Sequence, residues 1–272
     1  MLGCFGPQAL LVLTARASTD LSQNRVTWKK LGLSSANRAM TAWIATKTAA
    51  STISFSLWTL WENRFGQLNP GRADVIVRGW AQKLLDHADL RLKIHGLENV
   101  PAGETFVVMS NHQSLYDIPA LQVALPLTLR MIAKSDLFKV PIWSHAMLAA
   151  GYVPIHRGDP TKTLQDLRAA QKAVERGISI WIAPEGTRSQ DGSLGDFKLG
   201  GFHLASAVRA RILPVTIDGT RNCLCAGSLS AIRGITANVT IGEPIDPKAY
   251  GKKNRDALVR AVRDAIGAPL GR

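Results

Sequence analysis

From residue 90 onward, short apolar runs alternate with polar loops and with segments of helical periodicity. Seven runs have the length and composition of β-strands: 91–95, 105–109, 128–132, 151–155, 178–183, 212–217 and 237–241. Residues 161–176 repeat apolar side chains at helical spacing, and residues 253–266 do the same near the end of the chain. Strands separated by helices predict an α/β fold with a mostly parallel central sheet of about seven strands, flanked by helices.

The first 89 residues have a different pattern. Between Met40 and Trp61, a helix would carry one apolar stripe made of Trp43, Ala50, Ile53, Leu57 and Leu60/Trp61. This segment also contains Lys47 and several Ser and Thr, so it is too polar for a membrane span of ~20 apolar residues. Two interpretations remain open: a helix in the membrane interface, where Trp is enriched, or a soluble helix packed on the core.

A turn signal at residues 69–71 and a second helical pattern over 72–88 complete a basic, Trp-bearing helical hairpin. We therefore divide the chain into an N-terminal extension (1–38), a membrane-associating two-helix segment (39–89) and an α/β domain (90–272). The extension has no positively charged region ahead of its apolar stretch at 8–13, which argues against a secretory signal. It is expected to be disordered in part.

The composition adds a strong positive charge, with a formal net charge of +13 and a pI near 10.1. Such a chain attracts polyanions, either nucleic acid or anionic lipid. The Lys and Arg residues are dispersed, and no zinc-finger, RNP1 or basic-zipper pattern occurs, which favours a membrane surface or an anionic substrate over nucleic acid. The three cysteines form no CxxC pair and predict neither a disulfide framework nor a metal site.

Two short polar segments follow predicted strands. Asn111–Asp117 comes after the run 105–109, and Pro184–Arg188 comes after the run 178–183. Open α/β sheets place their sites where buried strands end, so these two segments are the candidates for chemistry.

His112 can accept a proton from a hydroxyl near neutral pH if a partner holds its other ring nitrogen, and Asp117 is the nearest candidate. On a regular helix five residues rotate by about 140°, so the two side chains would diverge. They meet only if His112 lies in the loop before a helix and Asp117 in its first turn, which Ser114 and Pro119 favour. The alternative is that Asp117 merely caps the helix and His112 is an ordinary loop histidine.

The second segment offers groups for an anion. Gly186–Arg188 can present backbone N–H groups and a guanidinium, and Glu185 can orient loop amides or Arg188, or bind a hydroxyl. Lys134 and Arg157 also stand near predicted strand ends. The alternatives are a tight turn with a surface ion pair and ordinary solvated cations.

The ordered motifs NHQSLYD, GYVPIHR, PEGTRS and ILPVTI resemble those of the glycerolipid acyltransferases of bacterial 1-acyl-sn-glycerol-3-phosphate acyltransferase type, over about residues 75 to 245. The resemblance implies that His112 and Asp117 are the catalytic dyad of an HX4D motif. It implies acceptor binding by Glu185, Gly186, Thr187 and Arg188, and contacts to the acceptor phosphate from Lys134 and Arg157. This sequence departs from the family's motif at Pro154, where an aromatic or aliphatic residue is usual, and at His156, where an acid is frequent.

The activity so implied is acyl transfer from acyl-CoA or acyl carrier protein to the sn-2 hydroxyl of a lysophosphatidate, giving phosphatidic acid for phospholipid biosynthesis. The thioester is a co-substrate, and no cofactor or metal is expected. The enzyme would work on an anionic membrane, at the cytoplasmic face of the inner membrane. Two alternatives are an O-acyltransferase for another lysolipid such as lyso-ornithine lipid, and a non-catalytic basic module that binds membrane or nucleic acid.

Overall fold

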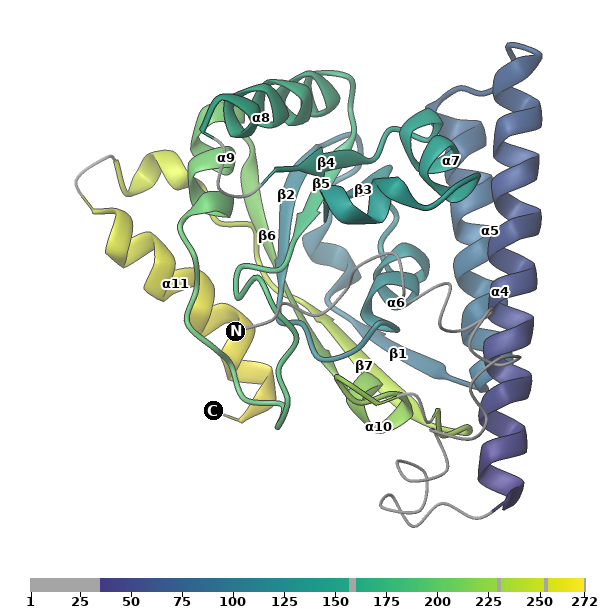
Figure 1. Ribbon diagram of the computed structural model, residues 1–272. Coiled ribbons are helices and arrows are strands. Elements are labelled where there is room, and N and C mark those ends of the chain that lie inside the picture. The colour runs from purple at the N-terminus through teal and green to yellow at the C-terminus, as the bar shows by residue number, and fades with distance from the viewer. Residues whose placement is uncertain (1–34, 157–159, 229–230, 252–253, 272) are drawn as a thin grey trace.

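The structure is a computed structural model that describes residues 35–156, 160–228, 231–251 and 254–271 (Figure 1). Residues 1–34 of the predicted extension and the predicted phosphate ligand Arg157 lie outside the described residues.

A seven-stranded sheet forms the centre of the molecule, in the order β1-β7-β6-β2-β5-β3-β4. The strands are β1 (Arg91–His95), β2 (Phe106–Ser110), β3 (Leu129–Lys134), β4 (Val153–Ile155), β5 (Ser179–Ile182), β6 (Arg211–Asp218) and β7 (Thr236–Ile241). β6 and β7 pair antiparallel, and the other pairings among the described strands are parallel. The predicted mostly parallel sheet of seven strands is confirmed.

Helices cover both faces of this sheet (Figure 1). They are α4 (Ser35–Arg64), α5 (Pro70–Ala88), α6 (Asp117–Ala124), α7 (Trp143–Ala149), α8 (Pro160–Glu175), α9 (Gly200–Val208), α10 (Thr220–Cys223) and α11 (Arg255–Gly267), with 3-10 turns η1 (Leu97–Asn99), η2 (Ser135–Lys139), η3 (Pro247–Ala249) and η4 (Ala268–Leu270). Side chains of β2 alternate between the two cores: Phe106 and Val108 pack with α5, α6 and α7, and Val107 and Met109 with α8, α9 and α11. A strand buried on both faces must be apolar throughout, which explains the continuous run at 105–109.

The two N-terminal helices lie side by side along one flank of the α/β domain (Figure 1). On α4, Glu62 is buried and accepts hydrogen bonds from the Trp58 indole at 2.8 Å and from Arg72 Nε at 3.0 Å. α5 is tied to the sheet by Asp74, which accepts from Nη1 of the fully buried Arg130 at 2.7 Å. These pairs hold their elements in one arrangement because the buried member, Glu62 or Arg130, would be left as an uncompensated buried charge without its partner.

The apolar stripe of α4 faces outward. Trp43, Ile53, Leu57 and Trp61 are between 45% and 54% exposed. The opposite, buried face consists mainly of small or polar side chains, namely Thr41, Ile44, Ala49, Thr52, Ser56, Thr59 and Glu62. The interpretation in which the stripe packs on the core is therefore wrong, because a soluble helix turns its apolar face inward. Within the described chain, we find no helix with both the length and the apolar character to cross a bilayer.

Candidate active site

The ends of three neighbouring strands meet at one edge of the sheet. β2 lies between β5 and β6, and its register pairs Met109 with Ile182 on one side and Ser110 with Val215 on the other. Because all three strands run in the same direction, the loops that follow them lie close together. Connections leave β2 and β5 toward opposite sides of the sheet, so this edge is also a topological switch point, where open α/β folds bind ligands.

Asn111 fixes the loop after β2 to the neighbouring strand. Its side-chain amide donates to the carbonyl of Ile217 at 2.8 Å, and its side-chain oxygen accepts from the N–H of Ile217 at 2.8 Å. The Gln113 side chain donates to the same carbonyl at 3.1 Å. The side chains thus continue the β2–β6 pairing beyond the last strand residue, and the loop that carries His112 is held in place.

His112 and Asp117 meet as the helix geometry requires. α6 begins at Asp117, His112 lies in the loop ahead of it, and His112 Nδ1 is 2.7 Å from Asp117 Oδ2. The aspartate side chain is fully buried, and the histidine side chain is 16% exposed. A carboxylate can only accept, so Nδ1 is the donor and Nε2 carries the lone pair that can take a proton.

The same carboxylate binds three further donors. Asp117 Oδ2 accepts from the N–H groups of Gln113 at 2.6 Å and Ser114 at 2.9 Å, and Oδ1 accepts from the Thr220 hydroxyl at 2.5 Å. Two of these donors precede α6 and the third, Thr220, begins α10 after β6, and no side-chain cap bond forms at the start of α6. The alternative that Asp117 is only a helix cap is therefore wrong. The four donors satisfy the hydrogen-bonding capacity of this buried carboxylate, as a buried polar group requires.

Thr220 and Trp181 were not among the residues predicted from the sequence. Gly219, which precedes Thr220, has φ 98°, and a Cβ there would lie 2.8 Å from the Thr236 carbonyl oxygen, so glycine is required. The polar residues 218–221 directly after a buried strand were the available signal. Trp181 packs edge-on against the His112 ring, with centroids 5.5 Å apart, and its indole donates to the Ser110 hydroxyl at 2.9 Å. No local pattern distinguishes it from an ordinary core tryptophan.

Glu185 joins the second polar segment to the first. Its side chain is buried, Oε1 accepts from the His112 N–H at 3.0 Å, and Oε2 accepts from the Gly195 N–H at 2.8 Å. In return, the Ser189 N–H donates to the His112 carbonyl at 2.7 Å. Glu185 therefore orients loop amides, one of its predicted options. Burial raises its pKa, although the hydrogen bonds from Gly195 and His112 act in the opposite direction.

The other predicted ligands are placed in part. Gly186 adopts a positive φ of 70°, Thr187 is exposed and Arg188 is half-buried, all in the loop that Glu185 begins. The backbone of Lys134 ends β3 in register with Ile155, and its side chain is outside the described residues. Among the described residues, no three His, Cys, Asp or Glu side chains gather as a metal site would require.

The two departures from the resembled motif have physical explanations. Pro154 lies on β4, an edge strand of the sheet, where a missing backbone donor is tolerated. The backbone N–H of His156 donates to Asp166 Oδ2 at 2.7 Å, and His156 Nδ1 lies 3.2 Å from the same oxygen. A carboxylate is thus present beside position 156 as well, but it belongs to Asp166 of α8 and not to residue 156 itself.

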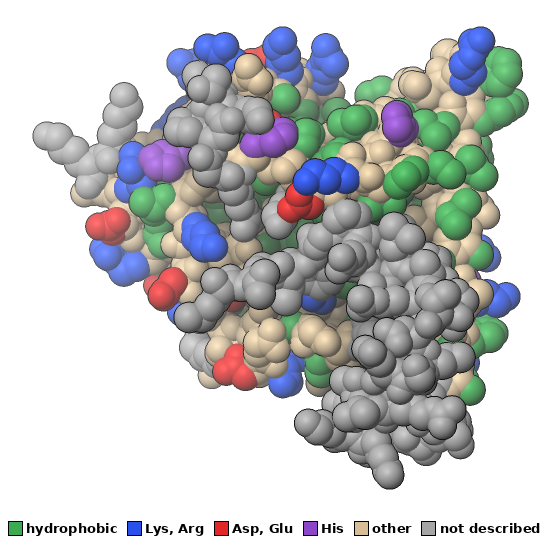
Figure 2. Space-filling view, viewed as in Figure 1, with side chains coloured by type: hydrophobic (Ala, Val, Ile, Leu, Met, Phe, Trp, Pro, Cys, Tyr) green, Lys and Arg blue, Asp and Glu red, His purple; other side chains and the backbone are tan. Residues whose placement is uncertain are grey.

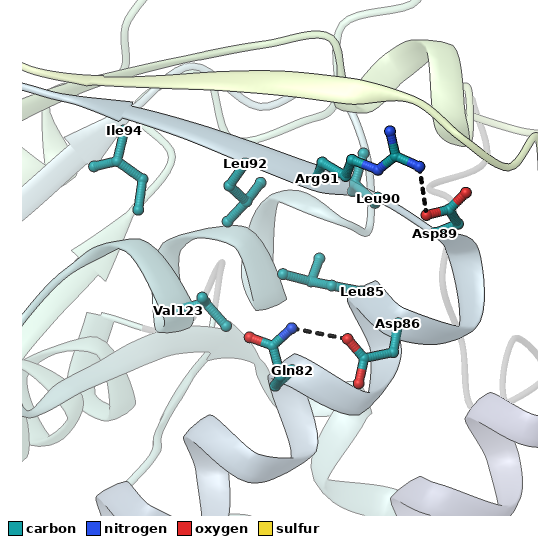
Figure 3. Close-up of a pocket in the computed structure, with 9 residues that line it drawn as sticks. All are labelled: Gln82, Leu85, Asp86, Asp89, Leu90, Arg91, Leu92, Ile94 and Val123. Atoms are coloured by element: carbon teal, nitrogen blue, oxygen red, sulfur yellow. Dashed lines mark hydrogen bonds and ion pairs between the residues drawn. The ribbon is translucent and has the colours of Figure 1, made fainter.

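A concavity lies away from this site. It encloses about 480 Å³ between the end of α5, β1 and α6 (Figure 3). Its acidic side chains are already paired, Asp86 with Gln82 and Asp89 with Arg91. It contains neither member of the dyad nor any residue of the loop at 184–188.

A histidine held by a buried carboxylate, at the carboxyl ends of parallel strands, is an arrangement suited to proton transfer. Residues 91–218 match the family model described as Acyltransferase. The chain is 36% identical over 181 residues to the chloroplastic 1-acyl-sn-glycerol-3-phosphate acyltransferase LPAT1 of Arabidopsis thaliana, covering 66% of this chain and 49% of that protein. It is 32% identical over 180 residues to the human 1-acyl-sn-glycerol-3-phosphate acyltransferase alpha, covering 65% and 62%.

The fold has a solved counterpart in the 1-acyl-sn-glycerophosphate acyltransferase PlsC from Thermotoga maritima. The TM-score is 0.74 at 24% identity, over 87% of this chain and 95% of that one. The matches to the curated relatives above span between about half and three fifths of those proteins' length. Residues 91–218 therefore belong to the acyltransferase family, and the relatives matched here are 1-acyl-sn-glycerol-3-phosphate acyltransferases.

Asp117→Asn separates the electrostatic role of this side chain from its structural one. The amide oxygen can keep the bonds from the His112 ring and the two loop amides, and the Thr220 hydroxyl can rotate to accept from the new NH2 group. The negative charge that stabilises a protonated imidazole is lost, so we expect kcat to fall by about a hundredfold or more. Urea unfolding should change much less than in Asp117→Ala. An unchanged kcat would mean that Asp117 only shapes the loop.

Glu185→Gln tests the cost of burying the Glu185 charge. Because burial raises the pKa of Glu185 in the folded state, its contribution to stability is fullest below the unfolded-state pKa and is lost as pH rises through the folded-state pKa. The free energy of unfolding of the wild type, minus that of the neutral variant, should therefore decrease between about pH 4 and pH 7. Urea titrations across that range measure it. A difference that grows with pH would show that the two amide bonds outweigh burial.

Proposed function

We propose that this protein transfers an acyl group from an acyl thioester to the sn-2 hydroxyl of 1-acyl-sn-glycerol-3-phosphate, making phosphatidic acid. The observation that carries the proposal is the His112–Asp117 pair, with Nδ1 bound and Nε2 left as the base, in a chain of the acyltransferase family. The names of its relatives support the acceptor.

The reaction follows from this geometry. His112 Nε2 accepts the proton of the acceptor hydroxyl while that oxygen attacks the thioester carbonyl. Asp117 stabilises the imidazolium that results, and the edge of Trp181 and the bonded loop keep the ring from turning. When the tetrahedral intermediate collapses, the C–S bond breaks and the leaving thiolate takes the proton back from His112. No side-chain nucleophile is needed because a thioester is already activated.

The donor is an acyl-CoA or an acyl carrier protein, and both present the same thioester to the base. The principal rival reaction differs only in its acceptor. It is the acylation of another lysolipid, such as a lyso-ornithine lipid, and it would use the same dyad. A non-catalytic basic module would account for the charge of +13 but not for a histidine held by a buried carboxylate.

The site is proposed to work at a membrane surface, on the cytoplasmic face of the inner membrane. Large exposed hydrophobic side chains concentrate on α4 and beside α7, including Leu57, Trp61, Ile142 and Leu148, at 43–54% exposure. Figure 2 shows hydrophobic side chains gathered along this flank. Exposed tryptophans with basic neighbours suit the lipid interface, as at Trp43, whose ring has Lys47 Nζ at 5.6 Å and Arg233 at 5.5 Å.

A panel of lysolipids and acyl donors tests the reaction. Purified protein should convert lysophosphatidate to phosphatidate with acyl-CoA or with acyl carrier protein, and His112→Ala should reduce kcat by at least about a hundredfold while the fold is retained. Product formation is measured by mass spectrometry of the lipid extract. If the wild type acylates only another lysolipid, the acceptor assignment is overturned. Failure with every donor and acceptor would overturn acyl transfer itself.

Leu57→Ser tests the membrane surface, with Leu97→Ser as its matched control on η1. Both leucines are about half exposed, at 51% and 45%, so neither change should affect folding strongly. Losing a side chain that enters lipid costs about 1.5 kcal/mol or more, so vesicle binding should weaken about tenfold for Leu57→Ser alone. Co-sedimentation with phosphatidylglycerol-containing vesicles measures this. Equal binding by both variants would show that α4 does not contact the lipid.

A further inference from the structure

The segment that follows the loop at 184–188 returns across it and is fixed at several points. The Gly195 N–H donates to Glu185 and the Lys198 N–H donates to the Pro184 carbonyl, each at 2.8 Å. From α11, Arg263 donates to the carbonyl of Leu194 at 3.0 Å and to that of Gly195. The backbone around Lys198 is therefore held against the loop by interactions that are independent of the Lys198 side chain.

The Lys198 side chain lies directly over Gly186. A Cβ added at Gly186 would be 2.9 Å from Lys198 Nζ and 3.1 Å from its Cδ. The stem covers the glycine, and the residue remains exposed to solvent. Within the part of the chain that the structure describes, no carboxylate forms an ion pair with this ammonium, whereas Lys139 is paired with Asp136.

A helix N-terminus lies beside the same loop. α9 begins at Gly200, two residues after Lys198, and a Cβ at Gly201 would touch Met109 and Ile182 at 3.1 and 3.4 Å. The first turn of α9 therefore abuts the ends of β2 and β5. Its N–H groups and its dipole add positive potential where the loop and Lys198 already favour an anion.

We infer that Lys198 is a substrate-binding residue that contacts the phosphate of the acceptor over the Gly186 loop. The assignment rests on the proposed function and deepens it, since neither the motif resemblance nor the comparisons assign Lys198. An exposed ammonium is a strongly hydrated point charge, suited to a phosphate that also faces solvent. Lys198 is less suited to the oxyanion that forms on the thioester carbonyl, because that oxyanion needs donors in a site from which water is excluded.

The phosphate has two possible sources, the acceptor head group and the nucleotide of acyl-CoA, and we assign it to the acceptor. The loop under Lys198 is bonded directly to the main chain of His112, the base that must meet the acceptor hydroxyl. In the acceptor, that hydroxyl and the phosphate are on neighbouring carbons, so the phosphate must stay close to the base. The nucleotide of CoA is separated from its thioester by the long pantetheine arm.

Three variants test the inference: Lys198→Met, which keeps the stem, Lys198→Arg, which keeps the charge, and Lys93→Met, which removes an exposed charge from β1. With the donor saturating, Lys198→Met should raise KM for lysophosphatidate about tenfold or more and leave kcat within about threefold, as expected for a lost charged hydrogen bond. Lys198→Arg should recover most of the loss. Lys93→Met should match the wild type, which excludes a general effect of net charge.

The possible results are distinct. A fall in kcat with KM unchanged would place Lys198 at the oxyanion and overturn the inference, and so would unchanged kinetics. A raised KM for acyl-CoA that disappears with an acyl N-acetylcysteamine thioester, which has no phosphate, would assign the contact to the donor and overturn it as well.

Calorimetric binding of sn-glycerol 3-phosphate to the wild type and to Lys198→Met separates the phosphate site from turnover. We expect the dissociation constant to rise about tenfold in the variant. If the variant binds sn-glycerol 3-phosphate more weakly than the wild type, but the wild type shows no turnover, the proposed reaction fails and the phosphate site stands. Equal dissociation constants would overturn the site.

Discussion

A single buried carboxylate, that of Asp117, constrains the whole edge of the sheet that carries the candidate site. It has no exposed surface, and a charge in that position is tolerated only if donors surround it. Its donors come from the His112 ring, from two amides of the same loop and from Thr220, which is 103 positions away in the chain. The loops after β2 and after β6 must therefore both be in place before the charge is satisfied, and the histidine is oriented by the same event.

Glu185 imposes a similar condition on the neighbouring loop. The Asp117 carboxylate fixes the imidazole of His112. The Glu185 carboxylate fixes the main chain of His112 and also accepts from the Gly195 N–H. The order β5-β2-β6 makes both possible because three parallel strands present their carboxyl ends side by side. The geometry of the base is thus set by groups that would not touch the substrate, which is why substitutions behind His112 should matter nearly as much as substitutions of it.

The sequence predicted what local periodicity encodes. Seven strands, the two N-terminal helices, α8 and α11 followed from apolar runs and helical periodicity. Helix geometry also gave the condition for the dyad, with His112 in the loop and Asp117 in the first turn, as one of two alternatives. The contacts between distant segments did not follow from these patterns. Thr220 reaches Asp117 only because β6 lies beside β2, and Trp181 reaches His112 only because β5 lies on the other side. Periodicity found the α4 stripe but could not tell whether it faces the core, because an apolar stripe has the same spacing in either case.

The reversed polarity of α4 separates two properties that usually share one surface. The face that holds this helix to the protein is made mainly of threonine, serine, alanine and a buried glutamate that pairs with Arg72, while the outward face has tryptophan and leucine. Mutations can therefore change the affinity of the outer face for its surroundings with little effect on folding. In the proposed membrane role, substitutions on the outer side of this one helix would adapt the protein to a different lipid composition and leave the chemistry untouched.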